Sequence, residues 1–395
     1  MSLNSSPNSN RIHIGIFGNR NAGKSSLINA ITSQNIAIVS DVLGTTTDPV
    51  EKAMELLPLG PVLIIDTPGL DDTGELGKKR VEKALGVLDK TDIAILVVDA
   101  RLKMSENDIA IEEKFKEKEI PYLVVYNKCD IAQRDIEGAF YVSSKTGENI
   151  DKLKEKLALL MPETLHEKRL VGDLIEKGDI VVLVTPIDES APKGRLILPQ
   201  QQTIRDILDS GACAIVTQEN ELSSMLSSLS KKPKLCITDS QVFKVVSEIV
   251  PYDIPLTSFS ILFARKKGNL EELAKGAKTL ETLSDGDKVL ISEGCTHHRQ
   301  CKDIGTVKIP NMILKHTKKQ IEFEFTSGGE FPLDVSEYKL IVHCGGCMLN
   351  ENQMKSRVQR AVKAGVPIVN YGIAIACMHG ILERSLECIP GSSLQ

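Results

Sequence analysis

The sequence predicts an α/β protein made of consecutive domains that are each built on a parallel sheet. Apolar runs of strand length alternate with amphipathic helical stretches along most of the 395 residues, and continuous apolar runs are typical of buried parallel strands. At roughly 150 residues per domain, this length indicates two or three domains. Two interruptions favour three: a charged segment over 163–171 after Met161-Pro162, and the basic stretch Arg265-Lys266-Lys267-Gly268.

We therefore expect a first domain over residues 1–168, with a disordered tail over 1–10, a second over 169–267 and a third over 268–395. The predicted strands lie at 12–18, 61–67, 93–100, 122–128, 179–187, 213–218, 234–239, 288–292, 339–343 and 367–372. The predicted helices lie at 25–33, 78–89, 107–118, 151–160, 199–211, 221–229, 240–250, 269–283 and 350–365, with a last helical stretch near the end. The second and third domains are expected to be Rossmann-like.

Composition and charge exclude several classes of protein. The net charge is −5, from 48 Lys and Arg against 53 Asp and Glu, which argues against a protein that coats nucleic acid or an anionic membrane. No apolar run approaches the roughly 20 residues that span a bilayer. The first ten residues lack the basic and apolar regions of a signal peptide, so we expect a cytoplasmic protein. There are nine cysteines, an odd number well below the density of a disulfide scaffold, and in a reducing compartment clustered cysteines indicate metal or redox chemistry.

A glycine-rich loop follows the first predicted strand. Gly18-Asn19-Arg20-Asn21-Ala22-Gly23-Lys24-Ser25 fits G-x-x-x-x-G-K-S and opens a helix, which is the context that a phosphate-binding loop (P-loop) requires. Gly18 and Gly23 let the backbone turn its N–H groups toward phosphates. Lys24 is expected to reach the β and γ phosphates, and Ser25 to bind Mg²⁺. The other residues expected to contact the nucleotide here are Asn21, Ala22 and Ser26.

Three further segments predict that the nucleotide is GTP or GDP. Asp66-Thr67-Pro68-Gly69 follows a strand, so that Asp66 can hold Mg²⁺ through water and the Gly69 N–H can face the γ phosphate. Asn127-Lys128-Cys129-Asp130 fits NKxD, in which the Asp130 carboxylate accepts guanine N1–H and N2–H, a donor pair that adenine lacks. Backbone N–H groups of a further segment are expected near guanine O6, in Ser143, Ser144 and Lys145.

These motifs resemble those of the translation-factor-like small GTPases, especially the bacterial tRNA-modification and ribosome-assembly branch. Gly44-Thr45-Thr46-Thr47-Asp48 resembles the switch I motif GTTxD of that branch, which implies Thr46 as a second Mg²⁺ ligand. The resemblance also implies that Asn21 helps bind a potassium ion that acts in place of an arginine finger; alternatively, Asn21 stabilises its own loop. Asp71 stands where many GTPases have a water-orienting Gln, so we expect slow intrinsic hydrolysis that potassium stimulates. The expected catalytic residues are Lys24, Thr46 and Gly69.

Two loops in the third predicted domain combine cysteine with histidine. Cys295-Thr296-His297-His298 follows one strand, and His343-Cys344-Gly345-Gly346-Cys347 follows another. Because both loops leave the carboxyl ends of parallel strands, they can converge. Cys-x-x-Cys suits zinc and iron–sulfur clusters alike, so the spacing leaves open an iron–sulfur cluster, a structural zinc site completed by His297 or His343, and a pair without metal. Cys301 is a reserve fourth thiolate, and the remaining cysteines are expected to be ordinary thiols.

The combination of GTPase motifs with Cys-x-His and a later His-Cys-x-x-Cys resembles the HydF family, the GTPases of FeFe-hydrogenase maturation. The resemblance covers the order of the domains and the motif HCGGCMLN. It implies a 4Fe-4S cluster on Cys295, Cys344 and Cys347, with His297 and His343 behind these ligands or as a fourth ligand. It further implies a scaffold that carries a diiron precursor, works with two radical-SAM maturases and delivers to the hydrogenase apo-protein, and a middle domain through which two chains form a dimer or a larger oligomer.

Two alternatives to this interpretation stay open at this point. One is an RNA-linked GTPase of the ribosome-assembly or tRNA-modification kind, which the GTPase motifs alone favour. The acidic balance, the scarcity of aromatic residues and the lack of a GXXG loop argue against it, so no nucleic-acid partner is expected. The other is a GTPase with a structural zinc domain and no cluster chemistry.

Overall fold

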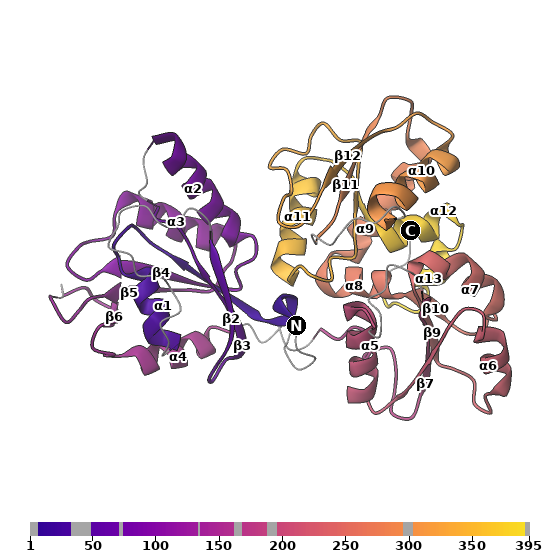
Figure 1. The fold of residues 1–395 in the computed structure, drawn as a ribbon, viewed down its shortest axis with the longest axis horizontal. Coiled ribbons are helices and arrows are strands. Elements are labelled where there is room, and N and C mark those ends of the chain that lie inside the picture. The colour runs from indigo at the N-terminus through magenta and orange to yellow at the C-terminus, as the bar shows by residue number, and fades with distance from the viewer. Residues whose placement is uncertain are drawn as a thin grey trace. The chain divides into compact units, whose positions relative to one another are not determined.

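The computed structural model of the chain describes residues 7–32, 49–70, 74–132, 135–161, 168–187, 196–294 and 303–391, with the backbone alone for 74–80. The chain folds into two compact units, Met1–Glu167 and Lys168–Gln395, and each is described by itself (Figure 1). The predicted class is confirmed, since both units are α/β and all but one of the paired strands are parallel.

The first unit contains a six-stranded sheet in the order β2-β3-β1-β4-β5-β6. Only β2 runs antiparallel to its neighbour, β3. The central strands are almost fully buried because their sequences are continuous runs of Ile, Leu and Val. The strands are β1 (Ile12–Phe17), β2 (Val50–Leu56), β3 (Gly60–Asp66), β4 (Ile93–Asp99), β5 (Tyr122–Asn127) and β6 (Phe140–Tyr141).

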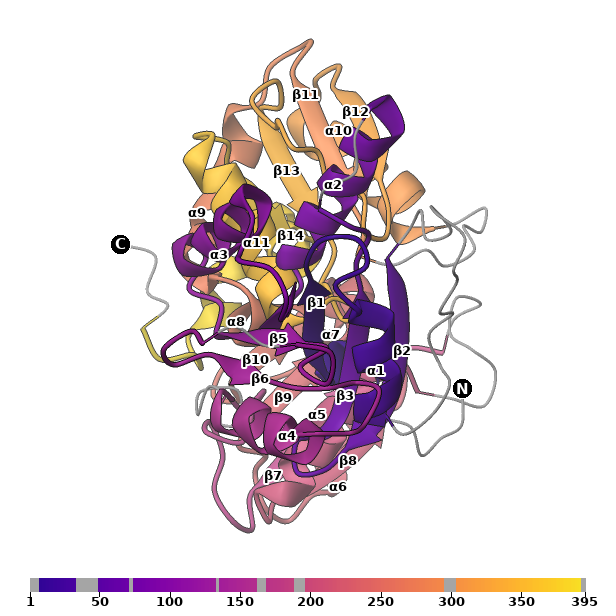
Figure 2. The same ribbon diagram turned by 90° about the vertical axis from the view of Figure 1, so that its left-hand side faces the viewer.

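Four helices cover the two faces of this sheet (Figure 2). The apolar side chains of α1 (Lys24–Thr32) and α4 (Ile150–Leu159) pack on one face, and those of α2 (Gly74–Leu88) and α3 (Glu106–Glu117) on the other. The start of α3 is set by a capping box, in which Ser105 and Asp108 bond reciprocally to each other's backbone N–H. A short 3₁₀ helix, η1 (Asn8–Asn10), precedes β1.

The second unit contains two four-stranded parallel sheets, in the orders β10-β9-β7-β8 and β12-β11-β13-β14. The first sheet consists of β7 (Ile180–Val184), β8 (Cys213–Thr217), β9 (Leu235–Thr238) and β10 (Leu256–Ser258). The second sheet consists of β11 (Lys288–Ser292), β12 (Glu322–Thr326), β13 (Leu340–His343) and β14 (Ile368–Asn370).

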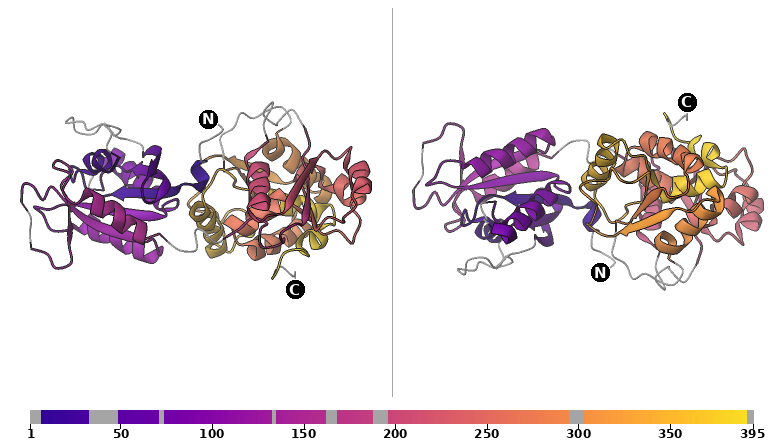
Figure 3. Two further views of the ribbon diagram at one scale, coloured as in Figure 1. Left: turned by 90° about the horizontal axis from the view of Figure 1, so that it is seen from below. Right: turned by 90° about the horizontal axis from the view of Figure 1, so that it is seen from above.

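Helices surround both sheets, and the rose and the orange-to-yellow parts of the chain lie side by side within this unit (Figure 3). One continuous core includes Val182 and Cys236 of the first sheet together with Ile291 and Ile341 of the second. The helices are α5 (Leu198–Asp209), α6 (Leu222–Ser228), α7 (Phe243–Ile249), α8 (Phe259–Lys267), α9 (Leu270–Ala277), α10 (Ile309–Thr317), α11 (Glu351–Lys363), α12 (Tyr371–Met378) and α13 (Leu382–Leu386). Shorter turns are η3 (Ser240–Val242), η4 (Lys278–Thr282) and the π-helical η5 (Ile304–Lys308).

A buried arginine, Arg384, connects α13 to the segment at the end of α7. Arg384 of α13 donates to the backbone oxygens of Ser247, Val250 and Pro251 at 2.7–2.9 Å, and its guanidinium lies over the ring of Tyr252. These bonds satisfy carbonyls near the carboxyl end of α7. The second and third predicted domains are therefore packed together within one unit.

Several elements were not predicted from the sequence. The strands β2 and β12 lie at sheet edges and read VEKAMEL and EFEFT, so they lack the apolar run of a buried strand. The helix α8 ends within the basic stretch that suggested a boundary: it includes Arg265, Lys266 and the buried Lys267, and Gly268 is its C-cap. Within the described ranges, no helix combines the length and the apolar character needed to cross a membrane.

Because α9 lies very close to β14, we expect that a methyl group added at Gly276 destabilises the second unit. A Cβ at Gly276 would lie 2.1 Å from the backbone oxygen of Ile368, so we expect Gly276→Ala to lower the free energy of unfolding of the second unit by about 1–3 kcal/mol. Gly86→Ala in α2 is the control, because a Cβ there meets nothing within 4 Å, and it should stabilise the first unit by about 0.5–1 kcal/mol. Chemical denaturation measures both; an unchanged or raised stability of the Gly276 variant contradicts the prediction.

Candidate functional site

The P-loop connects β1 to α1 at the carboxyl edge of the first sheet. Gly18 has φ +141° and a Cβ on it would lie 2.3 Å from the backbone oxygen of Val97; Gly23 has φ +93° and its Cβ would lie 2.3 Å from Nδ2 of Asn127. Only glycine fits either position. Lys24 is buried, and its Nζ donates to the backbone oxygens of Gly18 and Asn19, each at 2.9 Å. The loop is thus folded closely around the lysine that the sequence assigns to phosphate.

Ser25 and Asp66 are brought together beside this loop. The Ser25 hydroxyl donates to Oδ2 of Asp66 at 2.8 Å, while Oδ1 of Asp66 is buried and has no protein partner within the described part of the chain. Burial raises the pKa of Asp66, and the Ser25 hydrogen bond and the Lys24 charge oppose this rise. A buried carboxylate oxygen with no partner next to a hydroxyl is a donor set that fits Mg²⁺, which prefers oxygen ligands.

The segment after Asp66 contacts the P-loop through its backbone. Thr67 donates from its N–H and its hydroxyl to the oxygen of Ile16, and the Leu70 N–H donates to the oxygen of Gly18 at 3.4 Å. Gly69 is therefore held beside the P-loop. Thr46 lies outside the residues that the structure describes, as does Asp71.

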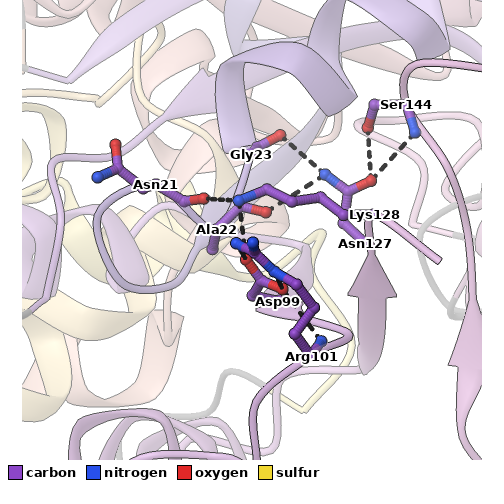
Figure 4. A network of polar contacts seen from close by, with 8 residues as sticks. All are labelled: Asn21, Ala22, Gly23, Asp99, Arg101, Asn127, Lys128 and Ser144. Atoms are coloured by element: carbon purple, nitrogen blue, oxygen red, sulfur yellow. Dashed lines mark hydrogen bonds and ion pairs between the residues drawn. The ribbon is translucent and has the colours of Figure 1, made fainter. Parts of the chain in front are cut away.

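The buried Asn127 connects three parts of the nucleotide site (Figure 4). Its Nδ2 donates to the backbone oxygens of Ala22 and Gly23 at 3.3 and 3.4 Å. Its Oδ1 accepts from the N–H and the hydroxyl of Ser144 at 3.1 and 2.9 Å. Because one amide group spans both contacts, Asn127 fixes the distance between the P-loop and the Ser143–Lys145 segment.

Lys128 lies against the outside of the P-loop. Its Nζ contacts the backbone oxygen of Asn21 and lies 2.8 Å from Oδ2 of Asp99 (Figure 4). Asp99 also accepts from the Nε and Nη2 of Arg101 at 2.9 and 2.7 Å, and the Arg101 guanidinium beside it holds the pKa of this carboxyl well below its usual range. Asp99 and Arg101 were not predicted from the sequence, although an Asp that closes an apolar strand at the motif-bearing edge was a usable signal.

The remaining predicted guanine contacts lie together at the end of the sheet. The buried Ser143 hydroxyl donates to Oδ1 of Asp130 at 2.6 Å, which orients an otherwise exposed carboxylate. Lys145 is exposed, and Ser26 lies half-buried in the first turn of α1. The Asn21 side chain is exposed and points away from the Lys128 contact in Figure 4.

A third residue whose role was not predicted from the sequence, Asn19, connects the P-loop to α3. The Nδ2 of Asn19 donates to Oγ of Ser105 at 2.7 Å and to Oδ2 of Asp108 at 3.2 Å. These two residues also form the capping box of α3, so the same polar group fixes the helix start and the loop. Nothing in the local sequence around Asn19 predicts this contact, because the partners lie 86 and 89 residues away.

The strand ends that lead into the two cysteine loops lie at the carboxyl edge of the second sheet of the other unit. Cys344 follows β13, and its Sγ accepts hydrogen bonds from the N–H of Gly294 at 3.0 Å and of Gly346 at 3.4 Å. Gly294 follows β11 and directly precedes Cys295, so the two loops start side by side. Burial raises the pKa of Cys344 to about 11 and also raises that of Cys347, while the N–H bonds oppose the rise at Cys344. N–H groups directed at a buried sulfur fit a metal-bound thiolate.

Both ring nitrogens of the buried His343 are occupied. Nδ1 lies 2.7 Å from the backbone oxygen of Cys344, and Nε2 lies 2.8 Å from Nη1 of Arg357. Since a guanidinium can only donate, Nε2 accepts and the ring is the neutral Nδ1–H tautomer. Burial and the Arg357 charge lower the pKa of His343 to about 3. In this arrangement His343 lies behind Cys344 and orients its carbonyl, and it has no lone pair left for a metal.

Arg357 in turn is held by the loop that follows β12. Its Nη2 donates to the backbone oxygen of Gly328 at 2.6 Å, and its guanidinium lies over the ring of Phe331. Cys295, His297 and Cys301 lie outside the residues that the structure describes. Within the described part, no group of three or more His, Cys, Asp or Glu residues could hold a metal ion, and seven cysteines are free thiols.

Comparison with family models divides the chain into three matched segments. A model described as 50S ribosome-binding GTPase matches residues 13–128. Two models of one family follow it: the hydrogen maturase F dimerization domain over 170–268 and the hydrogen maturase F tetramerization domain over 271–388. The chain therefore contains a GTPase domain, which supports binding of GTP or GDP with Mg²⁺ and GTP hydrolysis, and domains that support self-association.

The relatives found by sequence match little more than a third of this chain. A tRNA modification GTPase MnmE from Clostridioides difficile is 37% identical over 153 residues, which cover 36% of this chain and 33% of that protein. A GTPase Der from Wolinella succinogenes is 35% identical over 165 residues, covering 37% and 35%. The matched region spans about a third of the length of these relatives.

Among solved structures, the Era protein of Aquifex aeolicus is 19% identical and covers 55% of this chain and 98% of its own, with a TM-score of 0.35. The two maturase domain models carry more weight, because together they match more than half of the chain, next to the GTPase segment. The chain thus belongs to the hydrogen maturase F family, a family of hydrogenase-maturation GTPases.

Proposed function

We propose that the chain is a GTP-hydrolysing scaffold that carries a 4Fe-4S cluster and assembles or delivers the diiron precursor of FeFe-hydrogenase. The observation that carries this proposal is the contact between Cys344 and the Gly294 N–H, which joins the loop of the Cys-x-x-Cys pair to the start of the Cys295 loop. This contact occurs in a chain of the maturase family that also carries a complete guanine motif. The two features together support a protein that combines GTP hydrolysis with cluster binding.

The nucleotide part would work through groups whose positions are set by the sheet edge. Lys24 would exchange its bonds to the loop carbonyls for the β and γ phosphates, and Ser25 and Asp66 would hold Mg²⁺. Asp130, oriented by Ser143, would accept N1–H and N2–H of guanine. Hydrolysis would be slow because no water-orienting Gln follows the Asp66–Gly69 segment.

The role of GTP would be to switch contacts with partner proteins. Thr46 and the loop after Gly69 would order around the γ phosphate and relax after hydrolysis. The partners that this proposal requires are two radical-SAM maturases, which build the precursor, and the hydrogenase apo-protein that receives it. Self-association would use the middle part of the chain, where β8 lies at a sheet edge and can pair with a second copy.

The cluster site would use Cys344 and Cys347 together with Cys295. When bound, a 4Fe-4S cluster on three thiolates supplies a redox-active iron site with one coordination position open to an exchangeable ligand. The N–H groups of Gly294 and Gly346 would stabilise the Cys344 thiolate, and His343 would keep the Cys344 carbonyl in place. An RNA-linked GTPase remains the alternative that the relatives' names suggest, and salt-sensitive RNA binding would support it.

We expect Asp130→Asn to lower the affinity for GTP at least about tenfold and to create a preference for xanthosine triphosphate. The asparagine amide can donate to the 2-carbonyl of xanthine but cannot accept from guanine N2–H at the same atom. Asp151→Asn on exposed α4 is the matched control and should bind GTP normally. Titration with fluorescent nucleotides measures the preference, and unchanged GTP affinity in the Asp130 variant argues against the guanine assignment.

Potassium is expected to accelerate GTP hydrolysis of the wild-type chain over sodium at equal ionic strength. Asn21→Gly should abolish this difference while retaining GTP binding; glycine is the right replacement because Asn21 has φ +58°, which an alanine would strain. Phosphate release in the two salts measures the rates. Equal rates in wild type would refute the potassium site, and a difference that persists in the variant would refute the role of Asn21.

Each of Cys295→Ala, Cys344→Ala and Cys347→Ala should lose most of the iron and the visible absorption that anaerobic reconstitution gives the wild type. Cys213→Ala is the control, because this thiol is exposed on β8, away from the loops of the site, and it should retain both. Far-ultraviolet circular dichroism confirms folding. A colourless wild-type protein that holds zinc instead would support the structural-zinc alternative and contradict the proposal.

A further inference from the structure

Lys267, the last residue of α8, is a buried lysine directed at the cysteine loop. Its side chain is only 4% exposed. Its Nζ donates to the backbone oxygens of Gly346 at 3.3 Å, Cys347 at 3.0 Å and Leu349 at 2.7 Å. One side chain therefore ties down three carbonyls of the loop that carries the Cys-x-x-Cys pair.

These contacts require the charged form of the lysine. An ammonium has three N–H donors, and here three carbonyl acceptors surround it. Nζ also lies 5.4 Å from the centroid of the Phe263 ring, an arrangement that favours a cation.

The preceding lysine provides a contrast on the same helix. Lys266 is only partly buried, and its charged neighbours are the carboxylates of Asp206 and Glu351. It carries the same charge on the same turn of α8 and shares Glu351 as a charged neighbour, but the three bonds to the loop carbonyls belong to Lys267. Lys266 is thus a natural control for the effect of removing one positive charge from this region.

We infer that Lys267 is a positioning residue of the cysteine site, which holds the Cys344–Leu349 loop in its ligand-bearing conformation and places one positive charge beside the thiolates of an anionic cluster. The inference rests on the proposed function, because it assumes that an iron–sulfur cluster is the group bound there. The inferred contact between Lys267 and the loop does not require the cluster, so it can be measured in metal-free protein.

The expected effect on the cluster follows from its charge. Thiolate ligands and sulfides make the bound group anionic, and one-electron reduction adds a further negative charge. A buried ammonium stabilises the reduced form more than the oxidised form, because the interaction grows with the charge and is only weakly screened. Lys267 should therefore raise the reduction potential of the site.

Lys267 and the loop that it contacts belong to two different matched segments of the chain. The lysine lies within the segment matched by the dimerization model, residues 170–268, whereas the loop lies within the segment matched by the tetramerization model, residues 271–388. The bonds of Lys267 therefore join the two matched segments.

Three full-length variants test the inference: Lys267→Met, Lys267→Gln and the control Lys266→Met. In metal-free protein, hydrogen–deuterium exchange of the 344–349 amides should accelerate about tenfold in Lys267→Met and stay near wild type in the control.

In anaerobically reconstituted protein, a mediated dithionite titration followed by electron paramagnetic resonance should show a lower midpoint potential for both Lys267 variants. At a fixed potential the ratio of reduced to oxidised cluster should fall about tenfold, equivalent to about 1.4 kcal/mol.

Lys267→Gln separates the two roles, because it keeps N–H donors without the charge; its loop exchange should lie closer to wild type while its potential still falls. Wild-type exchange and potential in both Lys267 variants would overturn the inference while leaving the proposed function intact. An equal fall of the potential in Lys266→Met would overturn the specific role of Lys267. A wild-type protein that binds no cluster would contradict the proposed function and the charge role with it, and the exchange data would then decide the loop-holding role alone.

Discussion

Both candidate sites depend on one constraint, the parallel pairing of buried strands. Parallel pairing places the carboxyl ends of neighbouring strands at one edge of the sheet, so residues far apart in sequence reach the same place. In the first unit, Asp99 at the end of β4 pairs in register with Asn127 at the end of β5. In the second, Ser292 of β11 pairs with His343 of β13, and both strands end where a cysteine loop begins. The chemistry of each site is assembled by the register of its sheet.

Buried polar side chains then hold the loops that leave these edges. Asn127 joins the P-loop to the Ser144 segment, and Arg357 holds His343 behind Cys344. Such groups are costly to bury unless their bonds are complete, and once satisfied they fix a single arrangement of the backbone. Lys267 belongs to this class, because its ammonium has a carbonyl partner for each of its three donors. The backbone of the cysteine loop is therefore held in place by Lys267 and Arg357 and not by the cysteines themselves.

The GTPase motifs lie in the first unit and the Cys-x-x-Cys pair in the second. The GTPase segment resembles many GTPases of other roles, and its similarity alone leaves the activity of the whole protein open. What distinguishes this chain is its second unit, in which two sheets share one core and a pair of maturase domain models match. In this unit, side chains of two helices hold the segment that carries the Cys-x-x-Cys pair: Lys267 of α8 bonds to its carbonyls, and Arg357 of α11 bonds to His343.

The sequence by itself determined the α/β class, the phosphate and guanine motifs and the cysteine pair, because each is a contiguous pattern whose chemistry depends on neighbouring residues. It also predicted most of the buried strands, whose apolar runs need no partner to be recognised, but not the three-residue buried strand β10. It missed the edge strands β2 and β12, since a strand exposed on one side has no such run. The tertiary structure alone decided which residues contact the motifs. Asp99 forms an ion pair with Lys128, and Lys267 bonds to the cysteine loop about 80 residues further along the chain. These partners are set by strand register and helix packing, which act between distant segments; the local sequence signals only that Asp99 closes an apolar strand.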